Sequence, residues 1–110
     1  MQLKGKIVLI SFPFTDLTSS KLRPALVLHE SENDVIVAFI SSRTVKAKPT
    51  DVLISKEHPE FKQTGLKLKS FIKIDKIATL SKELVAGEIG EIGPVLRKKV
   101  NGQIQKIFKL

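Results

Sequence analysis

Arginine and hydroxyl residues are the side chains of this sequence best suited to phosphate chemistry. Arg23 precedes Pro24, which restricts the residue before it to an extended conformation. A guanidinium held at such a junction offers a planar fork of donors that fits a phosphate group, which a lysine does not. Ser41 ends an apolar run and is followed by Ser42 and Arg43. Taken alone, Ser41 is interpreted more simply as a strand-end hydroxyl that bonds to a backbone turn.

Most other kinds of catalytic site are missing from the sequence. There are no cysteines, which excludes disulfides, thiolate nucleophiles and cysteine-ligated metals. His29 and His58 lie in unrelated contexts without metal-ligand spacing; His29 is interpreted as a turn or surface residue and His58 as a loop residue. The acidic residues are dispersed, and the sequence contains no Gly-rich phosphate loop. An enzyme with this sequence would therefore act without a metal or another cofactor.

The composition indicates one basic globular domain that spans residues 1–110. Of the 110 residues 42% are hydrophobic, and the formal net charge of +8 is large for this length. A strong excess of lysine favours nucleic acid or an acidic protein as the partner, and we expect RNA. A solvated lysine-rich surface is the alternative. The apolar N-terminal run lacks a cleavage site, and no segment is long enough to span a membrane, so we expect a soluble, cytoplasmic protein.

Short β-branched runs between turn-forming residues fill the first two thirds of the chain, a pattern typical of a β barrel or sandwich. The predicted strands are Lys6–Phe12, Pro24–His29, Val35–Ser42, Asp51–Ile54 and Leu66–Ile77. A polar loop, Thr15–Leu22, joins the first two strands, and Lys56–Gly65 is predicted as an irregular or short helical turn. The fold class is therefore mainly β with a C-terminal helix, a barrel-like sheet closed by that helix.

The last predicted strand and the helix show which faces are apolar. The strand alternates between an apolar row and a basic row; the rows are Leu66, Leu68, Ser70, Ile72, Ile74 and Lys67, Lys69, Phe71, Lys73, Asp75. Ser70 is interpreted as a buried structural hydroxyl. From Pro94 onward the apolar residues recur every four positions, which predicts an amphipathic helix; they are Leu96, Val100, Ile104 and Phe108. Gly102 inside this helix costs about 1 kcal/mol relative to alanine.

Several segments, in order and spacing, resemble the MazF/PemK family of toxin ribonucleases over essentially the whole chain. The most specific is RPALVL at residues 23–28, after an N-terminal strand that ends in FPF. The others are GKIVLISFPF (5–14), FISS (39–42), TGL (64–66) and SFIKIDKIATLS (70–81). The resemblance implies an SH3-like barrel of the MazF, PemK and CcdB type, acting as a homodimer. It also implies metal-independent cleavage of single-stranded RNA at short sequences, and an acidic antitoxin as partner, with DNA contacted only through that antitoxin.

The resemblance also assigns the candidate catalytic residues. The family's essential arginine, immediately before proline, falls on Arg23, and its essential hydroxyl residue, usually threonine, falls on Ser41. Serine keeps the hydroxyl but lacks the β-branch that stiffens the side chain. Predicted RNA contacts lie in the polar loop, the basic segment after Ser41 and the basic row of the last strand; they are Thr15, Asp16, Ser19, Ser20, Lys21, Ser42, Arg43, Lys46, Lys67, Lys69 and Phe71, with Lys73 in the same row. Phe71 is expected either to stack on a base or to pack in a covered face.

Two other functions stay open from the sequence. The same barrel without catalysis would bind RNA or a protein, and a related toxin on a similar fold poisons a topoisomerase. Arg23 beside a strand-end hydroxyl favours the ribonuclease. The topoisomerase activity generally depends on C-terminal residues, and residues 106–110 carry no recognisable signature of it.

Overall fold

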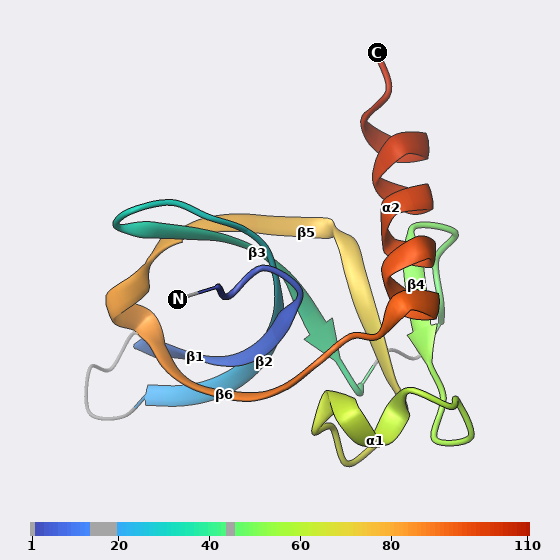
Figure 1. Ribbon diagram of the computed structural model, residues 1–110, viewed down its shortest axis with the longest axis horizontal. Helices are drawn as coiled ribbons and strands as arrows, with labels where there is room; N and C mark the ends of the chain where they lie inside the picture. The colour runs from blue at the N-terminus through green and yellow to red at the C-terminus, as the bar shows by residue number, and fades with distance from the viewer. Residues whose placement is uncertain (1, 14–19, 44–45) are drawn as a thin grey trace.

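A computed structural model describes residues 2–13, 20–43 and 46–110 and shows a curled antiparallel sheet flanked by a C-terminal helix (Figure 1). The strands are β1 (Lys6–Pro13), β2 (Ser20–Glu30), β3 (Asp34–Ser41), β4 (Asp51–Ile54), β5 (Ser70–Ser81) and β6 (Val85–Glu91). The helices are α1 (Phe61–Thr64), the 3-10 turn η1 (Lys82–Leu84) and α2 (Pro94–Phe108). The prediction of a mainly β fold with a C-terminal helix is confirmed. In the described residues no helix is long and apolar enough to cross a membrane.

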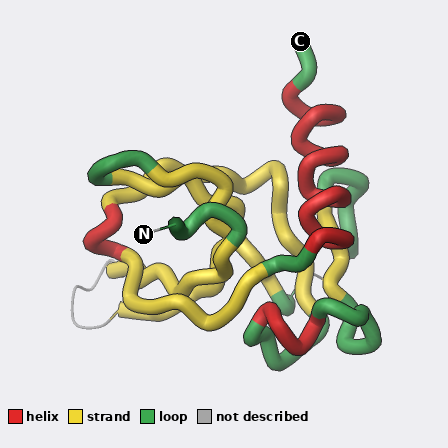
Figure 2. The backbone as a smooth tube through the Cα atoms, viewed as in Figure 1, coloured by secondary structure: helices red, strands yellow, loops and turns green. Residues whose placement is uncertain are grey.

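The six strands form one sheet in the order β4-β5-β3-β2-β1-β6. Every neighbouring pair is antiparallel, and the sheet is strongly curled (Figure 2). In the described chain β4 and β6 remain the two edges of the sheet, so the predicted barrel is a curled sheet that does not close by pairing. β2 begins at Ser20, inside the predicted polar loop Thr15–Leu22, because the pairing with β1 continues to the pair Pro13–Ser20.

Alternation along the strands gives the sheet two buried faces. One face packs against Leu96 and Val100 of α2, and its fully buried members include Ile7, Leu26, Ile72 and Ile74. The other face lies inside the curl, where β1, β2 and β3 bury Val8, Ile10, Ala25, Val27, Val35 and Val37. Burying a side chain of this size stabilises the fold by about 1.5 to 3 kcal/mol. The two clusters together fix how β2 and β3 lie beside each other.

β5 departs from the predicted strand Leu66–Ile77. It starts at Ser70, where β4 supplies a partner in the pair Ile54–Ser70, and it bends sharply along its length (Figure 1). The bend follows a register shift in the pairing with β3 between Ala38 and Phe39. The predicted apolar row is therefore wrong at Leu68, which is 56% exposed. The prediction that Ser70 is a buried structural hydroxyl is confirmed, since Ser70 is 3% exposed and donates to the Leu68 carbonyl at 2.8 Å.

A buried carboxylate ties the turn around α1 to the start of α2. Glu60 accepts hydrogen bonds from the backbone N–H groups of Val95 at 2.7 Å and Leu96 at 2.9 Å, and these groups have no partner inside the helix. Burial alone raises the pKa of Glu60. The two N–H donors and nearby His58 together lower it by more than burial raises it, so the pKa of Glu60 lies below the ordinary value. Glu60 therefore acts as the N-terminal cap of α2 from 35 residues away.

Candidate functional site

A cleft of about 270 Å³ opens between the ends of β2 and β3 and the segment that leads into β5. Its lining is basic and hydroxylic, with a few apolar side chains; it consists of Lys21, Leu22, Arg23, Pro24, Ile40, Ser41, Ser42, Arg43, Lys67, Leu68 and Ser70. Four of these residues are cationic, and none of the described residues that line the cleft is acidic. Such a surface attracts an anion.

The register of β2 and β3 brings the two predicted catalytic residues together. The pairing of these strands ends at Ala25–Phe39. Continuing that antiparallel register by two residues places Arg23 opposite Ser41, and residues that face each other across two strands share a side of the sheet. Because the ladder has ended there, the strands leave the space that forms the cleft. Both side chains line it.

The Arg23 side chain is exposed at the rim of this cleft. Its backbone is held in β2, opposite Ile10 of β1, and Ile10 is fully buried. In the part of the chain that the structure describes, no ion pair involves Arg23. The position of Arg23 is thus fixed by its backbone, while its guanidinium is available to a ligand.

The Ser41 hydroxyl combines the two interpretations that the sequence left open. Its Oγ accepts a hydrogen bond from the Arg43 backbone N–H at 3.1 Å, which is the strand-end turn expected for a structural serine. It also lines the cleft. A hydroxyl that accepts through one lone pair keeps its own O–H for donation. The turn therefore orients Ser41 without consuming its donor.

The structure brings together part of the predicted RNA-contact set. Lys21, Ser42, Arg43 and Lys67 all line the cleft with Arg23 and Ser41. Lys46 and Lys69 are exposed but lie outside that lining. Thr15, Asp16 and Ser19 lie outside the described residues, and Ser20 is described only as the first residue of β2.

Two residues of the predicted basic row are not at an open surface. Phe71 is 9% exposed and lies outside the cleft lining, with the Lys69 ammonium 5.9 Å from its ring centre, so the covered face is the interpretation that fits. Lys73 is 7% exposed, and its Nζ lies 2.9 Å from the Asp51 carboxylate. The prediction of an RNA contact at Lys73 is wrong, because a buried ammonium needs a partner and has one.

The sequence analysis missed the apolar part of the lining. Leu22 is 50% exposed and Leu68 is 56% exposed, and both line the cleft. Neither residue carries a local signal, since Leu22 ends the predicted polar loop and Leu68 lies in an alternating run where it is expected to be buried. Of the two histidines, His29 is an exposed residue of β2, and His58 lies in the turn before α1.

The acidic residues near the sheet are engaged elsewhere, which leaves the cleft positive. Ion pairs join Glu30 to Lys82, Glu91 to Lys6 and Asp75 to Lys48. Burial raises the pKa of Asp75, but the hydrogen bond and charge of Lys48, together with the charges of Lys76 and Lys73, lower it by more, so the pKa lies below its ordinary value. Within residues 2–13, 20–43 and 46–110 no cluster of histidine and acidic side chains is placed to hold a metal ion.

The fold and the cleft define a small β domain built to bind a polyanion at one end of its sheet. The sequence matches the family described as PemK-like, MazF-like toxin of type II toxin–antitoxin system over residues 3–108. The chain belongs to this family of toxins, and the resemblance predicted from its sequence is confirmed. The protein is thus a toxin of a type II toxin–antitoxin system.

Solved structures share the fold at low identity. The Mycobacterium tuberculosis toxin MazF-mt6 superposes with a TM-score of 0.74 at 23% identity, covering 96% of this chain and 97% of that chain. A mycobacterial endoribonuclease in complex with its cognate antitoxin superposes with a TM-score of 0.74 at 20% identity, covering 100% of this chain and 97% of that chain. The MazE–MazF structure from Deinococcus radiodurans superposes with a TM-score of 0.73 at 17% identity, covering 99% of this chain and 96% of that chain. A comparison with curated proteins gives no match.

Proposed function

We propose that the cleft between β2 and β3 cleaves single-stranded RNA through the RNA's own 2′-hydroxyl. The 2′-oxygen forms a bond to phosphorus, the bond from phosphorus to the 5′-oxygen breaks, and the products are a cyclic phosphate and a free 5′-hydroxyl. The 2′-hydroxyl loses a proton and the leaving 5′-oxygen gains one, so neither water nor a metal ion is consumed. The observation that carries the proposal is a cleft with four cations and no described acid, centred on Arg23 and Ser41.

Arg23 is assigned to charge stabilisation. Negative charge grows on the non-bridging oxygens of the phosphorane, and a guanidinium stays charged and presents two parallel donors to them. Ser41 donates its O–H to the same centre. The hydrogen bond from the Arg43 N–H uses one lone pair of Oγ and leaves the O–H free to donate. A preorganised donor of this kind is worth about 10²- to 10³-fold in rate. Which group accepts the 2′-proton is left open.

The other cations hold the strand. Lys21, Arg43 and Lys67 line the cleft at the rim and contact phosphates, which gives affinity without sequence choice. The exposed Leu22 and Leu68 supply apolar surface for a base or ribose. We propose that the RNA is messenger RNA, that the protein acts in the cytoplasm where this substrate is found, and that the acidic antitoxin covers the same cleft.

We also propose a homodimer as the active form. The C-terminal half of α2 extends past the sheet (Figure 1), and its apolar stripe ends at Phe108, which is 52% exposed. An exposed aromatic on an apolar helix face is better accommodated against a second protein surface than in water.

The experiment that tests the proposed function is cleavage of a long RNA by the purified protein, with cut sites mapped by primer extension in the presence and absence of EDTA. We expect equal cutting in both, with cyclic phosphate ends. An oligonucleotide with one 2′-deoxy residue at the mapped site is the matched substrate, and it should resist cutting there. Cutting of the deoxy substrate would refute the 2′-hydroxyl route. Intact RNA across varied sequences would favour a barrel that binds RNA or protein without cutting it.

A further inference from the structure

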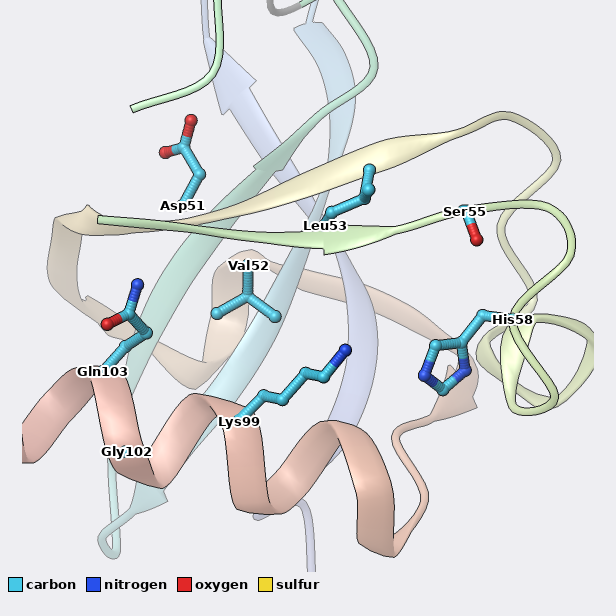
Figure 3. Close-up of a pocket in the computed structure, with 8 residues that line it drawn as sticks. All are labelled: Asp51, Val52, Leu53, Ser55, His58, Lys99, Gly102 and Gln103. Carbon is cyan, nitrogen blue, oxygen red and sulfur yellow. The ribbon is translucent and has the colours of Figure 1, made fainter. Parts of the chain in front are cut away.

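A second cleft, of about 380 Å³, lies between the edge strand β4 and helix α2 (Figure 3). Asp51, Val52, Leu53, Ser55, His58, Lys99, Gly102 and Gln103 line it. None of these residues was singled out for function by the sequence. The volume is in the range of ligand pockets, which begins at about 300 Å³.

One end of this cleft is built from donors. The Lys99 side chain reaches from α2 toward the end of β4, where Ser55 and His58 lie (Figure 3). His58 Nδ1 accepts a hydrogen bond from the Glu60 backbone N–H at 3.0 Å, so in the neutral ring the proton is on Nε2, which is a donor. In the described residues no ion pair involves Lys99. An ammonium, a hydroxyl and an imidazole N–H together fit the oxygens of an anion.

The acid that lines this cleft does not cancel the positive end. The Asp51 side chain is only 1% exposed, and it accepts from the Lys73 ammonium at 2.9 Å and from the Lys48 backbone N–H at 2.8 Å. In Figure 3 its carboxylate points away from the cleft and from Lys99. The charge that a ligand meets is therefore that of Lys99.

Gly102 keeps the cleft open on the helix side. A Cβ at Gly102 would meet no atom within 4 Å, so packing does not require glycine there. In a helix interior glycine costs about 1 kcal/mol relative to alanine. The next residue, Gln103, ties α2 to the Pro49 carbonyl before β4. The helix is thus anchored beside β4 while a gap is left between them.

The first cleft and the second cleft are connected across the edge strand β4. Ser41 pairs with Phe71, and Phe71 pairs with Leu53, so the three residues form one row across β3, β5 and β4. Two strand spacings of about 4.8 Å separate Ser41 from Leu53, about 10 Å in all. Leu53 is 45% exposed and lines the second cleft from the edge of the sheet. Its side chain points to the side of β4 away from Lys99 (Figure 3), so a strand that follows this row passes over β4 to reach the donors. OB-fold domains that bind single strands cover about 4 to 16 nucleotides each, so one RNA strand on a domain of similar size is long enough to reach both clefts.

We propose that the cleft between β4 and α2 is a distal subsite for the RNA strand, which holds a phosphate outside the scissile step at Lys99, His58 and Ser55. This rests on the proposed function, because it extends the path of the same substrate. Leu53 supports the strand between the two clefts. The subsite adds affinity for longer RNA and takes no part in the chemical step.

The test measures binding of uncleavable 2′-O-methyl oligonucleotides by fluorescence anisotropy, with one short oligonucleotide of three residues and one long oligonucleotide of ten. Lys99→Ala is the test variant. Lys98→Ala is its matched control, since Lys98 is the exposed neighbour on the same helix and does not line the cleft. Losing one phosphate contact on a single strand lowers the salt slope by about 0.7, which at 0.1 M salt is about fivefold in affinity.

We expect Lys99→Ala to weaken the long oligonucleotide about fivefold, to leave the short one unchanged, and to leave cleavage of saturating short RNA unchanged. Gly102→Leu, which fills the cleft, should give the same pattern. Equal behaviour of the Lys98 and Lys99 variants would overturn the subsite while RNA cleavage by the wild-type protein still stands. If the wild-type protein cuts no RNA, the proposed function fails, and the oligonucleotide binding decides the subsite separately. A Lys99 effect on binding of a polyglutamate peptide, without an effect on RNA, would overturn it in favour of an acidic protein partner.

Discussion

Replacing Arg23 separates catalysis from binding and from stability. Its side chain is exposed, and no described ion pair holds it. A surface substitution of this kind changes the free energy of unfolding by less than about 0.5 kcal/mol. In the transition state the same side chain supplies a donor to the phosphorane, and losing one such donor costs about 10²- to 10³-fold, or about 2.7 to 4 kcal/mol. We therefore expect Arg23→Ala to fold normally and to cut RNA at least 100-fold more slowly.

Single-turnover cleavage of a fluorogenic RNA at saturating protein measures this rate, and urea unfolding measures stability. Arg23→Lys keeps a charge but loses the planar fork, so its rate should lie between those of the wild type and Arg23→Ala. Arg43→Ala is the matched control in the same cleft. It should lower RNA affinity about fivefold at 0.1 M salt through one lost phosphate contact, while the rate at saturation stays the same. An Arg23→Ala protein that cuts at the wild-type rate would refute the assignment, as would equal effects of both arginines on the saturated rate.

Three further predictions concern other residues. Ser41→Ala should slow single-turnover cleavage about 10²-fold with little change in affinity for uncleavable RNA, and Ser41→Thr should retain activity; an unchanged rate in Ser41→Ala would remove the hydroxyl from the site. Glu60→Gln should lower the free energy of unfolding by about 1.5 to 3 kcal/mol near neutral pH. Because the pKa of Glu60 is lowered by folding, this difference should be full above the ordinary carboxyl pKa and shrink as the pH falls below it, and a pH-independent difference in urea unfolding would contradict the cap. Gly65→Ala should cost more than about 1 kcal/mol, since Gly65 has a φ of 76° and a Cβ there would collide with the Ile89 carbonyl; an unchanged thermal midpoint would show that this backbone relaxes freely.

The strands were predictable where period and burial agree. The runs that became β1, β2, β3 and β4 are bounded by turn residues and filled with apolar side chains, so local pattern was sufficient. Alternation at residues 66–69 continued the same period and extended the fifth strand too far. A strand needs a neighbour as well as a pattern, and β4 offers its first partner only at Ser70. Tertiary structure determines where β4 lies, and the alternation of residues within one segment carries no information about that.

β6 was not predicted, because two of its seven residues are glycine and glycine is depleted in strands. One of these glycines has a packing reason. A Cβ at Gly90 would collide with the backbone of Gln63 and Thr64 at the end of α1. The composition that resembles a loop is therefore what lets α1 lie against β6.

The burial of charged residues could likewise not be predicted from the sequence. Lys73 lies in an alternating run where its neighbours predict an exposed position, yet its partner Asp51 makes burial possible from 22 residues away. Glu60 looked like one of several dispersed acids and instead caps α2. Each role depends on a partner that only the folded chain supplies.

The two candidate catalytic residues differ in how plainly the sequence marked them, and the structure gives the reason. The Arg23 side chain makes no ion pair among the described residues, so its placement in β2, beyond the last pair with β3, is left without a structural explanation. Ser41 has a structural duty, the hydrogen bond from the Arg43 N–H, and that duty alone would account for a serine at the end of β3. The functional reading of Ser41 comes from its register opposite Arg23, which neither residue shows alone. A strand-end hydroxyl becomes a candidate donor when two conditions hold. The neighbouring strand carries a guanidinium at the facing position, without an ion-pair partner among the described residues, and the pairing between the two strands has ended.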